Sequence, residues 1–162
     1  MARVGRDLWG AMSANVVQAT FDSFMKSAGF SKKSGSWYRV SDEVITVVEL
    51  QKSQYGLQYY VNVALWLRAL GEANAPKEQA CHVRTRLSRL VGSAEDWLSS
   101  LLDLDAGVLD ASRRDELSTF LSVHLGPVLE VVDSLDGLRS PEGQRVINAA
   151  LVVGPARTLL AA

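Results

Sequence analysis

Six polar residues in the middle of the chain alternate along two segments, in a pattern that could form a binding surface. They are Glu49, Gln51, Ser53, Gln58, Tyr60 and Asn62. If the two segments pair as antiparallel strands, alternate side chains point to the same side of the sheet. Amides offer donors and acceptors, and a carboxylate accepts, so this face could bind a polar ligand or the backbone of a partner.

A basic set with the same alternation follows in the sequence: His82, Arg84 and Arg86. If this segment forms a strand beside the one that carries Asn62, its side chains join the polar face. Arginine presents a planar fork of donors that fits carboxylates and phosphates. We therefore expect a partner-binding or ligand-binding face made of Glu49, Gln51, Gln58, Tyr60, Asn62, His82, Arg84 and Arg86.

Two other interpretations of this polar face stay open. An antiparallel sheet with one solvated face shows the same alternation without any function, and Glu49 opposite Arg84 or Arg86 could simply form an ion pair. The other interpretation is an enzyme or small-ligand site centred on Glu49, Tyr60, Asn62, His82 and Arg86. In that site Glu49 or His82 would act as acid or base and Arg86 would hold an anion. Such a site needs a concave pocket.

A second candidate surface is the basic turn over residues 26–39, which contains no acid. Its cations are Lys26, Lys32, Lys33 and Arg39. With Trp37 and Tyr38 beside them, these cations could contact phosphates and stack on a base. However, 17 Lys and Arg residues are balanced by 18 Asp and Glu residues, which disfavours nucleic acid as the main partner. We expect Trp37 to point into the core.

Familiar catalytic and metal-binding patterns are missing from the sequence. Two histidines and one cysteine provide no metal-ligand spacing, and the chain has no glycine-rich phosphate loop or serine-hydrolase turn. Cys81 and His82 are neighbours on an expected strand, so their side chains point to opposite faces. We expect a buried Cys81, a structural His124, no catalytic residue, no metal site and no cofactor.

The elements that must position these residues follow from periodicity. A helix is predicted over residues 13–28 with Gly29 after it, then a polar loop over 31–36 and strands over 37–40, 44–51 and 57–68. In the second and third strands, paired positions sum to 111, which places Val48 opposite Val63 on the core face and Glu49 opposite Asn62 on the polar face.

The remaining chain is predicted to be a loop over 71–79, a short strand over 82–87 and then helices. Ser93, Ser112 and Ser140 each precede an apolar helical stripe, and Gly126-Pro127 should kink or split the second of these helices. The fold class is α+β: an N-terminal helix, an antiparallel meander of three to four strands, then C-terminal helices packed on the core face of the sheet. A chain of 162 residues forms a single domain, expected over 1–162.

A family pattern runs through much of the first hundred residues. It is carried by Val44, Trp97 and the segments 29–33, 37–39, 50–56, 59–63 and 81–87. Over about residues 20–100 the chain resembles a bacterial family of domains of unknown function, number 4304. The resemblance implies a bacterial source and an α+β domain, but it implies no activity. The resemblance fades after about Ala106, so the helices beyond it are predicted from periodicity alone.

Taken together, these patterns predict a non-enzymatic module that recognises another protein, with an immunity or antitoxin factor as one form of it. A small anionic-ligand binder or an enzyme on the polar face is the alternative, and nucleic-acid binding through residues 26–39 is a further one. The single cysteine and the absence of a secretion signal predict a cytoplasmic protein. The longest stretch without charge, 53–67, contains Gln54, Gln58 and Asn62, so no membrane-spanning helix is expected.

Overall fold

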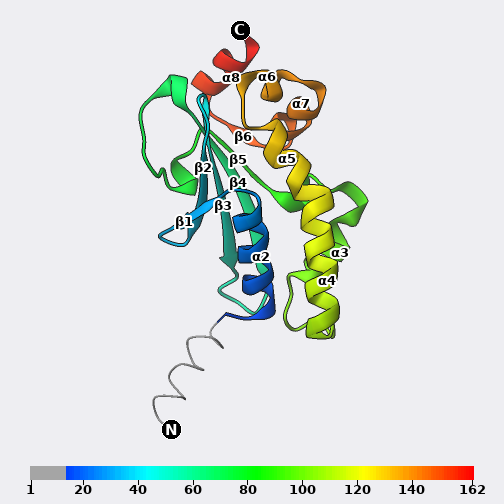
Figure 1. Cartoon of the computed structure of the whole chain (residues 1–162). Helices are drawn as coiled ribbons and strands as arrows, with labels where there is room; N and C mark the ends of the chain where they lie inside the picture. Colours follow the sequence, from blue (N-terminus) through cyan, green and yellow to red (C-terminus); the bar gives the residue numbers. More distant parts are fainter. Residues whose placement is uncertain (1–13) are drawn as a thin grey trace.

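The computed structural model describes residues 14–162 and has an α+β fold built on an antiparallel sheet (Figure 1). The strands lie in the order β1-β2-β3-β4-β5-β6. Their bounds are Ser31–Lys33, Ser36–Val40, Val44–Lys52, Tyr59–Leu67, Val83–Arg86 and Leu151–Val152. The predicted fold class is confirmed, but the sheet has six strands where three to four were expected.

The two additional strands lie at opposite edges of the sheet. β1 occupies residues that were predicted to be a loop, and it turns tightly into β2 through Ser34 and Gly35. Both turn residues have positive φ angles, 52° and 87°, as a two-residue hairpin turn requires. At the other edge, β6 pairs with β5 through only two residues, Leu151 and Val152. Such short strands show no alternation in the sequence, so periodicity could not predict them.

The central strands pair in the predicted register. Val48 lies opposite Val63, and Glu49 lies opposite Asn62, so the positions sum to 111 as expected. β5 is antiparallel to β4 and places Arg86 opposite Asn62. The preference for a strand over residues 82–87 is therefore confirmed for its central part, and β5 ends where a short 3-10 turn begins at Leu87.

The helices flank and follow the sheet. Their bounds are Val16–Ser27 for α2, Glu95–Leu101 for α3, Asp110–Phe120 for α4, Gly126–Val131 for α5, Leu135–Arg139 for α6, Pro141–Asn148 for α7 and Gly154–Ala161 for α8. Asn15 and Gln18 form a capping box at the start of α2, and Gly29 follows its end with a φ of 85°. The predicted start of this helix at Ser13, and the first residues, in which no secretion signal was expected, lie outside the described residues.

Two of the predicted helix starts are wrong, and one is confirmed. No side chain caps α3 or α4: Ala94 precedes α3 and Leu109 precedes α4, so Ser93 and Ser112 are not N-caps. Acids in the first turn of each helix place negative charge at the positive end of the helix dipole instead. At α7 the prediction holds, because the Ser140 hydroxyl accepts a hydrogen bond from the Gly143 N–H, with proline as the first helical residue.

The predicted break at Gly126-Pro127 takes the form of a wide helical turn. α4 ends at Phe120, and residues Leu121–Leu125 form a π-helical segment in which the Gly126 N–H bonds to the Leu121 carbonyl. Pro127 has no N–H to donate to the carbonyl of Val123, four residues earlier, which favours the interruption. The wide turn also keeps leucines spaced four residues apart on the core side: Leu117, Leu121, Leu125 and Leu129.

The helices cover one face of the sheet (Figure 1). α2 and α4 pack together over the predicted core face, where Phe21, Phe120, Val48 and Val63 belong to one buried cluster. A second cluster joins the far ends of β3 and β4 to α6, α7 and α8, which gather at one end of the molecule (Figure 1). Over residues 14–162 no helix has the length and apolar character needed to cross a membrane.

The opposite face of the sheet changes character along its length. At one end, Ile45, Val47, Ala64 and Cys81 form a small buried cluster, against which Trp66 packs. His82 packs on the same Trp66, so the expectation that Cys81 and His82 point to opposite faces is wrong, because both residues precede β5 and do not alternate as strand residues do. Further along the same strands, the polar residues predicted from the sequence take over. This change places the candidate site at the polar end of the sheet, beside the end of β5.

Candidate functional site

Asn62 is the centre of a hydrogen-bonded network that joins three neighbouring strands. Its amide nitrogen donates to Glu49 Oε1 at 3.0 Å and to Gln51 Oε1 at 2.8 Å, both on β3. Its amide oxygen accepts from Arg86 Nε on β5 at 3.1 Å. Asn62 is only 5% exposed, so these bonds satisfy a buried amide, while Gln51 at the end of the network is exposed.

Arg86 is held in place by neutral groups rather than by an acid. Besides its bond to Asn62, it donates from a terminal nitrogen to Gln51 Oε1 at 3.4 Å. The guanidinium carbon lies 4.3 Å from the centre of the Tyr60 ring, within the range of a cation–π contact. None of the four ion pairs among residues 14–162 involves Arg86. Its positive charge is therefore fixed in position without a carboxylate partner.

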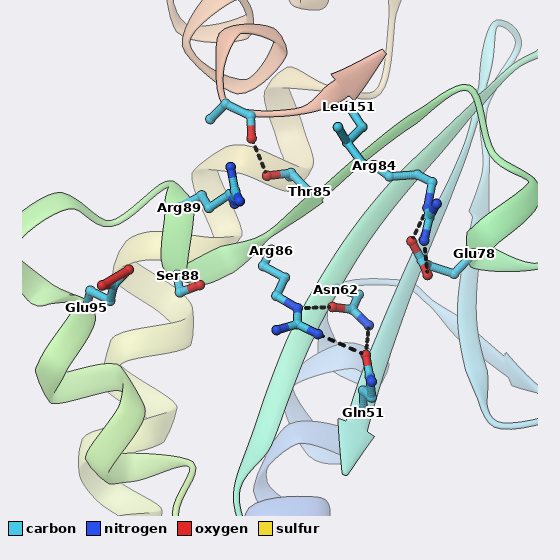
Figure 2. Close-up of a pocket in the computed structure, with 11 residues that line it drawn as sticks. Gln51, Asn62, Glu78, Arg84, Thr85, Arg86, Ser88, Arg89, Glu95 and Leu151 are labelled. Carbon is cyan, nitrogen blue, oxygen red and sulfur yellow. Dashed lines mark hydrogen bonds and ion pairs between the residues drawn. The ribbon is translucent and has the colours of Figure 1, made fainter. Parts of the chain in front are cut away.

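Arg84 has a different partner from the one considered in the sequence analysis. Figure 2 shows its guanidinium turned toward Glu78, to which it donates two hydrogen bonds of 2.7 and 3.2 Å. Glu78 comes from the loop over 71–79 and is buried. The ion pair proposed between Glu49 and Arg84 or Arg86 is wrong, because Glu49 accepts from Asn62 and Arg84 is occupied by Glu78. The hydrogen bond to Glu78 raises the pKa of Arg84 further.

His82 lies on the same face but away from the network. Its Nδ1 accepts a hydrogen bond from the Leu67 N–H at 2.9 Å, and its ring packs on Trp66 with the centroids 4.2 Å apart. Burial lowers the pKa of His82. Neighbouring Cys81 is buried, and burial followed by the nearby charge of Glu78 raises the pKa of its thiol to about 12. The structure therefore separates His82 from Glu49 and Arg86 and makes Cys81 a poor nucleophile.

The side chains around the end of β5 enclose a hollow with a volume of about 480 Å³ (Figure 2). Gln51, Asn62, Arg84 and Arg86 of the predicted face line it. The remaining lining side chains are Thr85 of β5 itself and residues from the loop before β5, from the segment after it and from the chain around the start of β6. The polar face is thus concave at this end, which a flat solvated sheet would not be.

A smaller hollow of about 210 Å³ adjoins the first and brings in Gln58 and Tyr60. Arg86, Ser88 and Glu95 line both hollows, so the two form one groove with Arg86 near its middle. Gln58 itself donates to the Ser99 carbonyl at 3.2 Å, which ties the end of the groove to α3. We call these two hollows together the Arg86 groove.

The sequence analysis missed several residues of the groove. Glu78 lies in a segment without periodicity, and Ser88, Arg89 and Glu95 follow β5 where the chain turns away from the sheet. Only their nearness in sequence to Arg84 and Arg86 could have pointed to them. Arg89 makes no hydrogen bond or ion pair with another side chain among the described residues, so the groove holds a second cation without an acid partner.

The basic turn is not the cluster that the sequence indicated. Arg39 is directed inward, where it donates to the Ala28 carbonyl at 2.8 Å and the Leu129 carbonyl at 2.7 Å. Trp37 is 2% exposed, as expected, and Lys32 lies 3.5 Å from Asp22. The surface there lacks both the arginine and the stacking tryptophan that nucleic-acid binding would use. Within residues 14–162, no group of three or more His, Cys, Asp or Glu side chains could hold a metal ion.

In a comparison with known proteins, a family model described as a domain of unknown function (DUF4304) matches residues 21–131. The match includes the polar network and all of the Arg86 groove except its border around the start of β6. No curated protein and no solved structure matches the chain.

Proposed function

The chain belongs to the DUF4304 family of domains of unknown function, and we propose that it is a non-enzymatic module that binds an acidic segment of a partner protein. The Arg86 groove is the binding site. The observation that supports this proposal most directly is the state of Arg86, which is oriented by Asn62, Gln51 and Tyr60 but has no carboxylate partner. The guanidinium of an arginine held in this way can donate hydrogen bonds to a carboxylate of another molecule.

The shape and chemistry of the groove suit a peptide segment. Its two hollows adjoin along the sheet and α3, so a ligand that fills both must be elongated. Arg86 and Arg89 offer donors to acidic side chains, while the amide nitrogen of Gln51, which makes no hydrogen bond among the described residues, can donate to a backbone carbonyl. Glu95 lies at the border of the groove and would repel an acidic side chain of the peptide placed next to it. The peptide would therefore bind only in a register that places its acids beside the arginines and away from Glu95.

The geometry argues against an acid–base enzyme at this site. The two groups considered for that role, Glu49 and His82, belong to separate hydrogen-bond systems. Tyr60 and Arg86 are joined to Glu49 through Asn62, but no described contact joins them to His82. The residues that remain together are suited to holding an anion, and this supports binding over catalysis.

The proposal is tested with two variants of matched chemistry. Arg86→Gln removes the charge in the groove, and Arg145→Gln removes a charge on α7 outside it. A Glu-rich peptide should bind the wild type and Arg145→Gln alike, and Arg86→Gln about tenfold or more weakly, as the loss of a charged hydrogen bond implies. Equal binding to all three, or equal binding of the peptide with Gln in place of Glu, would reject the proposal.

The same variants extend the test to the natural partner. Under this proposal the protein acts in a bacterial cytoplasm, and an immunity or antitoxin factor would bind a protein made from an adjacent gene. Affinity capture from the native bacterium should recover one partner in stoichiometric amount with wild type and with Arg145→Gln. Recovery of no such partner, or undiminished recovery with Arg86→Gln, would contradict it.

A small anionic ligand is the second candidate, because the larger hollow is concave and its volume of about 480 Å³ is in the usual range for small-molecule sites. A thermal-shift screen with nucleotides, sugars and carboxylates distinguishes the two candidates. A true ligand at 100 times its dissociation constant adds about 2.7 kcal/mol to the free energy of unfolding. Flat shifts across the screen leave the protein-binding proposal in place.

A further inference from the structure

A third hollow lies on the helical side of the molecule, between α5, α7 and the segment after β5. Its volume is about 390 Å³. Val128, Val131 and Val146 form its apolar wall, while Arg89, His124 and Arg145 contribute polar groups. Arg89 also lines the Arg86 groove, but no other residue is shared between them. We propose that this hollow binds a small carboxylic acid with an apolar body.

The charge of the hollow favours an anion. Arg89 and Arg145 are opposed by a single carboxylate, Glu142. Among the described residues, none of these three side chains takes part in an ion pair. The two arginines therefore keep their donors available above an apolar wall. A carboxylate satisfies such donors with two parallel hydrogen bonds, and an apolar body attached to it would fill the space between the valines.

The backbone on one side of the hollow has an unusual conformation, which is consistent with a ligand site. His124 and Val123 come from the π-helical segment, and Pro127 follows it. π-helical turns in long helices are rare and occur frequently at functional sites. In this segment the His124 ring packs against Phe120, with centroids 4.3 Å apart, and Pro127 has no N–H to donate to the Val123 carbonyl. The turn thus shapes the wall of the hollow.

The ligand must be small, since about 390 Å³ is near the lower end of the range of about 300–1,000 Å³ for small-molecule sites. A medium-length fatty acid fits this description, and octanoate is a suitable probe. Its uncharged counterpart, 1-octanol, has a body of the same length. The comparison between the two therefore reports on the arginines, whereas binding of either reports on the apolar wall.

The experiment is a titration of the full chain followed by amide NMR shifts. Octanoate should give saturable shifts at residues of α5 and α7, and 1-octanol should bind about tenfold more weakly because it lacks the charged hydrogen bonds. Arg145→Gln should weaken octanoate binding toward the affinity of octanol, with Arg89 retaining part of the difference, and Val131→Phe should block both by filling the hollow. Arg86→Gln, which changes only the other groove, should bind octanoate as the wild type does.

Several outcomes would overturn this proposal. Shifts that do not saturate, or that map to the Arg86 groove, would show that octanoate has no site between α5 and α7. Equal affinity for octanoate and octanol in the wild type would indicate an apolar site, of the kind that takes a side chain of a partner protein. Because the peptide test of the Arg86 groove uses a different probe and a different variant, each proposal can fail while the other stands.

Discussion

Asn62 and Gln51 are partners in one network, yet they differ in how much the fold depends on them. Asn62 is buried and bonded to three side chains, whereas Gln51 is exposed and shares its oxygen between Asn62 and Arg86. Removal of a buried partner leaves the groups that it bonded without hydrogen bonds. This lowers the free energy of unfolding more than the loss of an exposed partner does.

We therefore predict that Asn62→Ala lowers the free energy of unfolding by about 1–3 kcal/mol and Gln51→Ala by only about 0.5 kcal/mol. Val48→Ala, on the core face and 0% exposed, serves as the internal control and should cost about 2 kcal/mol. Urea denaturation measures all three. If Gln51→Ala costs as much as Asn62→Ala, the network extends into the interior at both residues, which would contradict the exposure of Gln51.

Arg113 is the clearest case of an arginine that serves the fold. It is 1% exposed and donates to the carbonyls of Ser100, Leu101 and Ala106, at and beyond the end of α3. None of the ion pairs among the described residues involves Arg113. Instead of an acid, the negative end of the α3 helix dipole compensates the charge of Arg113.

Arg113→Met should destabilise the protein by about 3 kcal/mol, because it leaves these carbonyls without donors. The adjacent Arg114 is exposed on the same helix, so Arg114→Met is a matched control with an expected effect within about 0.5 kcal/mol. Chemical denaturation of the pair measures the difference. Equal stability of the two variants would mean that the carbonyls find other donors, for example water.

The lowered pKa of His82 predicts how stability depends on pH. Above pH 6.5 the imidazole is neutral in both the folded and the unfolded chain. As the pH falls below 6.5, the unfolded chain binds a proton that the buried folded ring resists, so the free energy of unfolding decreases until the folded pKa is reached. His82→Asn retains an acceptor for the Leu67 N–H but does not titrate. Its melting temperature should therefore fall less than that of wild type between pH 7.5 and 5.5, and identical slopes would refute the effect.

At the scale of elements, α5, α6 and α7 approach one another so closely that only glycine fits at two positions. A β carbon at Gly143 of α7 would overlap the carbonyl oxygen of Gly137 in α6, and one at Gly137 would overlap that of Val131 in α5. Because both obstacles are backbone atoms, no side-chain rotation can relieve them.

Gly143→Ala should therefore destabilise the protein by about 3 kcal/mol, at the upper end of the usual cost of overpacking. Gly107→Ala, where a β carbon meets no atom within 4 Å, is the control and should have little effect. Thermal denaturation provides the comparison. Retention of wild-type stability in Gly143→Ala would show that α6 and α7 can separate without loss of their shared core.

The strands that the sequence predicted well are the long ones. β3 and β4 have nine residues each, and matching the polar and apolar positions of the two strands was enough to predict their register and the two faces of the sheet. β1 and β6 are too short to show a period. The predicted starts of α3 and α4 are misplaced because a serine before an apolar stripe often caps a helix, whereas here the acids in the first turn stabilise its start.

The same reasoning explains what was predicted of the site. Alternation says which face a side chain occupies, and this placed Arg86 beside Asn62 correctly. It says nothing about how far apart two residues on one face lie, so His82 was grouped with Arg86 although it packs at the apolar end of the sheet. Glu78 comes from a loop, where no periodicity exists to reveal its contact with Arg84.

For the molecule as a whole, arginines join the helices to each other and to the sheet. Arg39 of β2 bonds to carbonyls at the ends of α2 and α5, Arg113 of α4 bonds to the end of α3, and Arg139 of α6 bonds to Leu159 and Leu160 of α8. Each uses the positive charge where a helix presents unpaired carbonyls. Arg86 and Arg89 donate to no helix carbonyl among the described residues, so their charges remain available for the binding proposed above.

Arg39 is the residue with which to test whether arginines hold the helices on the sheet, because of these three arginines it alone lies on a strand and contacts two helices. Arg39→Met should cost about 2 kcal/mol and should reduce the protection of amides from hydrogen exchange at the ends of α2 and α5 together. Arg157→Met, on the exposed side of α8, is the control. Loss of protection in only one of the two helices would show that they open independently of Arg39.

The outermost strands determine how the sheet behaves when many copies of the protein meet. The long strands β3 and β4 lie inside, whereas β1 has three residues, two of them lysine, and β6 has two. Pairing between the sheets of two molecules needs a long and uncharged row of free backbone groups, which neither of these strands provides. Within residues 14–162 the edges of the sheet therefore offer no starting point for fibril growth, and aggregation through this sheet should require prior unfolding.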